Sequence, residues 1–248
     1  MSDEKKVTFV TGGASGIGKA VCFELSSKGE SLIIADIDES KGVDTCKEIL
    51  SNGGEAIFQK VDVRKRNEIR HAADTGLKEF GKITGLVNCA GLVTMTSLDE
   101  LTEEEWDLVV DVNLKGTWLT TQEVSRDIAA AGGGAVVNIS TVEAEVVVSS
   151  KGYCQVHYNA SKGGVKMLTK ALSVELAKKS IRVNAVAPGP IATDFVSLEG
   201  ITAPETLEDL KTRLLIPRVG LPEDVAKAVR FLLSEAVSYT HLRAHETS

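Results

Sequence analysis

The chain has 248 residues, 43% of them hydrophobic and 25% charged, as expected for a globular protein that buries a sizeable core. Its 28 Lys and Arg are outnumbered by 35 Asp and Glu, and the net charge of −7 argues against nucleic acid or an anionic membrane as the main partner. The hydrophilic first residues lack the apolar core of a signal peptide, and no uncharged apolar run approaches the roughly 18 residues that span a bilayer.

The cysteines and histidines are scattered along the chain. No Cys-x-x-Cys pair occurs, which predicts buried thiols in a reducing, cytoplasmic location: Cys22, Cys46, Cys89 and Cys154. The histidines lack metal-ligand spacing, so no catalytic metal is expected: His71, His157, His241 and His245.

The first predicted strand, residues 7–11, runs into a glycine-rich segment at 12–18. Ile17, Val21 and Leu25 recur every four residues and predict a helix that Gly29 ends. Glycines at 12, 16 and 18 allow a tight turn and close approach of a ligand, and the helix N-terminus offers N–H groups to a pyrophosphate.

The second predicted strand, 31–35, ends at Asp36, 18 residues after Gly18. A carboxylate there can accept hydrogen bonds from both ribose hydroxyls and repels a 2′-phosphate. Ile37 follows where a phosphate-binding Arg could otherwise stand, so the pattern favours NAD over NADP. The alternative is a strand-end acid that caps the next loop.

The alternation of strands and helices continues along the chain. Further strands are expected at 56–63, 85–89, 135–140 and 182–187. Helices are expected at about 40–51, near 66–80, from after Thr102 to about 130, and from Tyr158 onward. Thr102 and Glu105 form a potential capping box, and Gly116 inside the long helix indicates a packing or site constraint. Strands separated by helices predict an α/β fold, a single-domain doubly wound parallel sheet (Rossmann fold) over residues 1–236. Residues 237–248 lack a strand pattern and are expected to be a foreign or read-through tail outside the native fold.

Tyr158 and Lys162 lie one turn apart on a predicted amphipathic helix. Free tyrosine has a pKa of about 10, and a nearby ammonium is expected to lower it enough for proton exchange with an alcohol or ketone. Such a pair also occurs on solvated helix faces, so it gains meaning only beside a site for a hydride carrier.

With these features in place, residues 5–238 resemble the short-chain dehydrogenase/reductase family. The resemblance rests on ordered motifs: the Thr-Gly-x-x-x-Gly-x-Gly turn at 11–18, Asp62-Val63, Asn88–Gly91 with Cys89 in place of a second Asn, the set Asn113, Tyr158 and Lys162, and Pro188-Gly189 followed by Ile191 and Thr193. It implies that NAD is bound by Gly12, Ser15, Gly16, Ile17, Gly18, Asp36, Ile37, Asp62, Val63, Asn88, Ala90, Gly91, Tyr158, Lys162, Pro188, Gly189, Ile191 and Thr193.

The resemblance also implies an oxidoreductase that transfers a hydride between NAD(H) and a secondary alcohol or ketone. Tyr158 serves as general acid and base, Lys162 binds the nicotinamide ribose and lowers the tyrosine pKa, and Asn113 holds a relay water. The alternatives are a catalytically silent dinucleotide-binding regulator on the same fold and, less compatible with the chain length, an epimerase or dehydratase.

One departure from the family pattern concerns the substrate-binding serine. The position 13 residues before the tyrosine is Glu145, whereas alignment from the strand end assigns the role to Thr141 and implies a four-residue insertion between 142 and 157. Ser140 is the alternative, although strand alternation turns it to the other side. His157 is expected to be a loop histidine that points elsewhere.

Substrate choice is expected to depend on residues 92–97, the insertion and a lid at 190–217, whose apolar side chains favour a moderately hydrophobic alcohol or ketone. The resemblance implies a homotetramer or homodimer, with one interface built from helices at 103–130 and 158–178 and the other from the final helix, at 222–234, and a final strand. The tail is expected to weaken the second interface.

Overall fold

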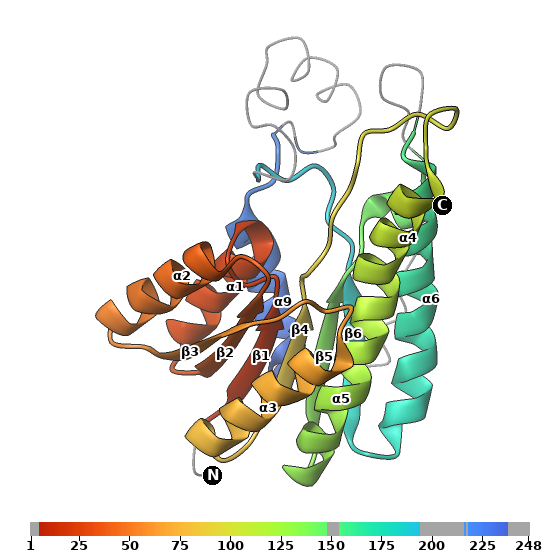
Figure 1. Cartoon of the computed structure of the whole chain (residues 1–248). Coiled ribbons are helices and arrows are strands. Elements are labelled where there is room, and N and C mark those ends of the chain that lie inside the picture. The colour runs from red at the N-terminus through yellow and green to blue at the C-terminus, as the bar shows by residue number, and fades with distance from the viewer. Residues whose placement is uncertain (1–4, 148–153, 194–215, 217, 238–248) are drawn as a thin grey trace.

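The computed structural model describes residues 5–147, 154–193, 216 and 218–237. Six parallel strands form one sheet in the order β3-β2-β1-β4-β5-β6 (Figure 1). Their bounds are β1 Val7–Thr11, β2 Ser31–Asp36, β3 Glu55–Lys60, β4 Gly85–Asn88, β5 Gly134–Ile139 and β6 Ile181–Val186. This confirms the predicted doubly wound parallel sheet.

Helices cover both faces of the sheet (Figure 1). They are α1 Gly16–Ser26, α2 Glu39–Ser51, α3 Arg66–Phe80, α4 Glu103–Val110, α5 Gly116–Ala130, α6 Val156–Ala177 and α9 Pro222–Leu233. Successive side chains of a strand point to opposite faces of the sheet and pack in two separate hydrophobic cores. Phe9 packs with α3, α5 and α6, whereas its neighbour Val10 packs with α1, α2 and α9.

The predicted long helix after Thr102 is present but divided. A π-helical turn, Asp111–Lys115, separates α4 from α5. Gly116 is the first residue of α5. A Cβ there would lie 2.7 Å from Cγ2 of Val63, so the expected packing constraint is confirmed. Thr102 accepts the N–H of Glu105 at 3.2 Å, while the Glu105 carboxylate accepts the Thr96 hydroxyl instead, which leaves the capping box half-formed.

Strand β3 ends at Lys60, three residues before the predicted end at 63. The chain turns away from the sheet at Asp62, whose Oδ1 accepts the main-chain N–H of Arg64 at 3.0 Å. At the other end of the chain, a short 3₁₀ helix, Glu235–Val237, follows α9 and buries Val237. The fold thus includes the first residue of the expected tail, and 238–248 lie outside the described residues.

All four cysteines are free, with Cys22 and Cys46 buried and Cys89 and Cys154 partly exposed. The cytoplasmic location inferred from their scatter stays a prediction. Within the described residues, no helix is long and apolar enough to cross a membrane, and no group of three or more His, Cys, Asp or Glu is placed to hold a metal ion.

Candidate active site

The predicted cofactor turn joins β1 to α1 at the carboxyl end of the sheet. Gly12 has a φ of +68°, and a Cβ there would lie 2.7 Å from the main-chain nitrogen of Ala90. A Cβ at Gly18 would lie 2.0 Å from the carbonyl oxygen of Gly12. Only glycine fits these positions, and the result is a turn that presses directly against the segment after β4.

Ser15 is the N-cap residue of α1, yet its hydroxyl makes no capping hydrogen bond. Within the described residues, the first N–H groups of α1 and this hydroxyl are therefore available as donors at the turn. Thr193 closes the far side, since its Cγ2 lies 3.5 Å from the position of a Cβ on Gly16. The predicted residues from 12 to 18 and Thr193 are brought together as expected.

Asp36 ends β2 beside this turn. Its Oδ2 accepts the N–H of Ala14 at 2.9 Å, and its Oδ1 accepts the N–H of Asp38 at 3.0 Å. The alternative role of Asp36, a strand-end acid that caps the next loop, is therefore present in the structure. Each carboxylate oxygen still keeps a further lone pair for a ribose hydroxyl. Ile37 is 60% exposed next to it.

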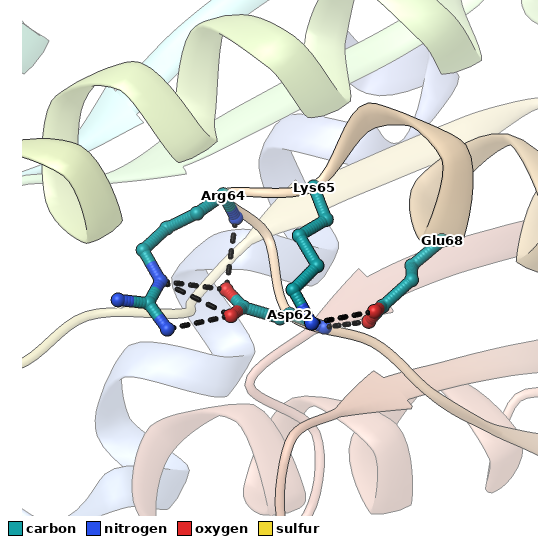
Figure 2. A network of polar contacts seen from close by, with 4 residues as sticks. All are labelled: Asp62, Arg64, Lys65 and Glu68. Carbon is teal, nitrogen blue, oxygen red and sulfur yellow. Dashed lines mark hydrogen bonds and ion pairs between the residues drawn. The ribbon is translucent and has the colours of Figure 1, made fainter.

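Asp62 and Val63 follow β3, and both are buried. The Arg64 guanidinium donates hydrogen bonds to the Asp62 carboxylate, with Nη2···Oδ2 at 2.6 Å and Nε···Oδ1 at 2.9 Å (Figure 2). Hydrogen bonds from Arg64 hold the pKa of the Asp62 carboxyl below its usual range. Glu68, itself paired with Lys65, accepts the Asp62 N–H at 2.8 Å and fixes the turn (Figure 2).

The Asn88 side chain is engaged inside the fold, and its expected contact with the cofactor stays a prediction. Its Nδ2 donates to Asn138 Oδ1 at 2.8 Å and to Thr121 Oγ1 at 3.1 Å, inside the core between strand and helix. The side chain therefore ties β4 to β5 and α5. Ala90 keeps its expected place, since its N–H donates to Thr11 Oγ1 at 3.2 Å beside the glycine turn.

Asn113 lies fully buried in the π-helical turn. Its Oδ1 accepts the N–H of Leu92 at 2.8 Å, and its Nδ2 donates to the Leu92 carbonyl at 2.9 Å and to Ser161 Oγ at 3.0 Å. The amide thus clamps the segment after β4 onto α6. The Asn113 carbonyl oxygen also accepts the Thr117 hydroxyl, at 2.7 Å, and the role of holding a relay water stays a prediction.

Gly91 lies against both the Asn113 side chain and Lys162. A Cβ at this position would lie 3.2 Å from Asn113 Oδ1 and 3.4 Å from Lys162 Nζ. Lys162 is buried, and its Nζ donates to the carbonyl oxygen of Ile139 at 2.8 Å. Burial lowers the pKa of Lys162 to about 8.

Tyr158 and Lys162 share one face of α6, as predicted, with Nζ 5.9 Å from the tyrosine ring centroid. Thr141 caps the 3₁₀ turn after β5, and a hydrogen bond from its hydroxyl favours the ionised form of the Tyr158 phenol. Ser140 points away and donates to the carbonyl oxygen of Lys162 at 3.3 Å. The structure therefore places Thr141, and not Ser140, beside the tyrosine.

Pro188, Gly189 and Ile191 follow β6 and line the same edge of the sheet. The Pro188 carbonyl oxygen accepts the N–H of Val142 at 3.0 Å and the Thr141 hydroxyl at 3.4 Å, which joins this segment to the tyrosine side of the site. Ile191 forms an isolated parallel bridge with Gly220, which leads into α9.

A family profile described as enoyl-(acyl carrier protein) reductase matches residues 12–245. Cyclopentanol dehydrogenase from Comamonas sp. (strain NCIMB 9872) is 36% identical over 236 residues, which cover 95% of this chain and 92% of that protein. The chain belongs to the short-chain dehydrogenase/reductase family.

Other relatives agree with this assignment. 3-Oxoacyl-[acyl-carrier-protein] reductase FabG from Thermotoga maritima is 37% identical over 95% of this chain and 93% of that protein. The solved structure of a short-chain type dehydrogenase/reductase from Mycobacterium ulcerans superposes with a TM-score of 0.88 at 31% identity, covering 97% of this chain and 87% of that one.

The short-chain dehydrogenase/reductase family implies a nicotinamide dinucleotide cofactor, and the residues present fit it. The glycine turn leaves no room for a Cβ at Gly12 or Gly18, and the Ser15 hydroxyl makes no capping hydrogen bond at the start of α1. Asp36 stands at the end of β2, where a ribose is bound in this fold.

The expected lowering of the Tyr158 pKa is wrong for this structure. Burial, with a contribution from the charge of Glu143, raises the pKa of Tyr158 to about 12, and the Thr141 hydrogen bond offsets only part of that. The Lys162 ammonium lies over the ring, 5.9 Å from its centroid, and donates a hydrogen bond to the Ile139 carbonyl oxygen. The spacing of Tyr and Lys on a helix could not reveal how deeply the phenol is buried.

His157 is also placed differently from the prediction. It lies inside α6, fully buried, and not in a loop. Its Nε2 is 2.7 Å from the hydroxyl of Thr94, which belongs to the segment expected to shape the substrate pocket. Gln155 reaches the same segment through Met95 Sδ at 2.9 Å. Sequence reasoning missed these two positioning residues because nothing in the pattern shows that the helix begins before Tyr158.

Proposed function

We propose that this oxidoreductase uses NAD(H) and interconverts a secondary alcohol and a ketone, with Tyr158 as the proton donor and acceptor. The observation that carries the proposal is the convergence of the Tyr158 phenol and the Thr141 hydroxyl at the carboxyl edge of the sheet, next to Lys162 and the glycine turn.

Tyr158 and Thr141 act on the substrate oxygen. The Thr141 hydroxyl, which donates to the Pro188 carbonyl oxygen at 3.4 Å, turns its proton to the substrate oxygen when substrate binds, and the phenol gives that oxygen a proton during ketone reduction. With a pKa of about 12 the phenol is protonated at neutral pH and ready to donate. In alcohol oxidation the same phenol must first lose its proton, so the oxidation rate should rise with pH through the alkaline range.

Lys162 and Asn113 hold this arrangement together. Lys162 anchors α6 to the end of β5 and presents a buried positive charge beside the ring of Tyr158. Asn113 fixes the loop after β4 against the same helix. The bound dinucleotide supplies or accepts the hydride.

NAD(H) is favoured over NADP(H) by the charges at the end of β2. Asp36 and the N-cap Asp38 place two carboxylates where a 2′-phosphate would lie. Lys60 is paired with Asp36 in the register of the sheet, but its Nζ turns to Glu39 at 3.2 Å.

A second candidate is reduction of a 3-oxoacyl thioester, supported by the 37% identity to the Thermotoga reductase. The experiment compares kcat/KM for NADH and NADPH with cyclopentanone, acetoacetyl-CoA and a ketone panel. We expect NADH to be preferred and cyclopentanone to be reduced faster than acetoacetyl-CoA. A preference for NADPH would contradict the cofactor proposal, and no turnover with any ketone would favour the catalytically silent alternative.

A further inference from the structure

Glu143 is a half-buried carboxylate next to the proposed acid–base group that the mechanism above does not use. It lies on the 3₁₀ turn Val142–Ala144, directly after Thr141, and its own N–H donates to Thr141 Oγ1 at 3.3 Å. This hydrogen bond fixes the main chain of the turn against Thr141, the residue whose hydroxyl is proposed to hold the substrate oxygen.

One oxygen of this carboxylate has no partner. Glu143 Oε2 is buried and receives no hydrogen bond in the described part of the chain. Burial raises the pKa of Glu143, and the Glu143 charge also contributes to the raised pKa of Tyr158, so the carboxylate lies near the phenol. A buried acceptor without a donor is costly, and native proteins satisfy nearly all such groups.

The cations on α6 are engaged elsewhere. Lys166 forms an ion pair with Glu145, the other carboxylate of the same loop. Lys162 donates to the Ile139 carbonyl. Neither supplies a donor to Glu143 Oε2, which stays without a partner in the described part of the chain.

We propose that Glu143 determines substrate specificity by accepting a hydrogen bond from a donor group, a hydroxyl or an ammonium, on the carbon next to the reacting carbon. The inference rests on the proposed function and narrows its substrate class to vicinal diols, amino alcohols and the matching ketones. A simple alcohol leaves Glu143 Oε2 unsatisfied, whereas a vicinal donor satisfies it. A site built to hydrogen-bond a substrate group discriminates strongly against analogues that lack the group.

The test uses three alcohols of nearly the same shape, cyclopentanol, 1,2-cyclopentanediol and 2-aminocyclopentanol, with NAD⁺ and four proteins: wild type, Glu143→Ala, Glu143→Gln and Glu145→Gln. Glu145→Gln is the matched control because it neutralises a carboxylate two residues away that pairs with Lys166. For wild type we expect kcat/KM for one vicinal substrate to exceed that for cyclopentanol by about tenfold or more.

Glu143→Ala should abolish this preference, so that the ratio of kcat/KM for the vicinal substrate to kcat/KM for cyclopentanol falls to about one, and Glu145→Gln should keep the preference. Glu143→Gln distinguishes the two donors, since an amide oxygen still accepts from a hydroxyl but loses the charge that attracts an ammonium. Thermal melting of each variant verifies folding.

Two results would overturn the inference alone: a wild type that oxidises cyclopentanol as well as the vicinal substrates, or a Glu143→Ala variant that loses activity equally on all three. A wild type that binds NADH, measured by fluorescence, but oxidises none of the three would instead count against the proposed alcohol–ketone function, and the inference would fall with it.

Discussion

The Nζ atom of Lys162 lies 5.9 Å from the ring centroid of Tyr158, yet its hydrogen bond goes to the carbonyl oxygen of Ile139, at 2.8 Å. The lysine therefore joins α6 to the end of β5 and places a positive charge beside the tyrosine ring. Burial brings the Lys162 pKa down to about 8 while the Tyr158 pKa stands at about 12. The pKa of each group differs from its ordinary value because both side chains are buried away from water.

Lys162→Ala removes the anchor and the charge together. We expect NADH to bind at least about tenfold more weakly and kcat to fall at least about 100-fold, a loss in the range of general acid–base contributions. Fluorescence titration measures binding, and steady-state reduction of cyclopentanone measures kcat. NADH binding equal to that of wild type would show that Lys162 does not reach the cofactor.

Thr141→Val removes the hydroxyl at nearly constant volume. We expect kcat to fall about 10- to 100-fold, because loss of one donor to the substrate oxygen weakens the transition state more than the ground state. Ser140→Ala is the control, since Ser140 donates to the main chain of α6 and should affect kcat less than threefold. A larger loss from Ser140→Ala would reverse the assignment.

The fold could be predicted from the sequence because the local signals agree with one another. Apolar runs at β1 and β2, the glycine turn and helical spacing each point to the same alternation of strand and helix. Asn113 shows the limit, because the π-helical turn that holds it arises where the long helix meets the loop after β4 and Ser161, contacts between distant segments. The Tyr158 pKa was mispredicted for the same reason: burial is a property of the folded chain.

His157 gives a pH-dependent stability. It is fully buried, so desolvation lowers its pKa below the usual 6.5, and the unfolded chain binds a proton more readily than the folded one. The contribution of His157 to the free energy of unfolding is therefore fully present above about pH 6.5 and is lost as the pH falls below that value.

We expect the wild-type Tm to drop between pH 7 and pH 5 by about 2–4 °C more than that of His157→Gln. His71→Gln, which changes an exposed histidine of α3, should behave as wild type. Parallel curves for wild type and His157→Gln would contradict this account.

Assembly through α4, α5 and α6 stays a prediction that the surface supports. These helices lie side by side (Figure 1), and Trp118, Met167 and Val174 on them are 40%, 63% and 78% exposed. We expect light scattering to show a dimer or tetramer, and Met167→Glu with Val174→Glu to yield monomers if the particle is a dimer. Phe231→Glu on α9 probes the other interface and should leave that dimer intact. A monomeric wild type would refute the helix-bundle interface.

The direct test of the account is Tyr158→Phe, which deletes the phenol oxygen and keeps the ring beside Lys162. Two quantities are measured on the purified variant: NADH affinity by fluorescence titration and kcat for the best ketone found in the substrate panel. If Tyr158 supplies the proton, kcat falls at least about 100-fold while the NADH Kd stays within about twofold of wild type. A variant that keeps most of its kcat would show that another group moves the proton and would contradict the central claim.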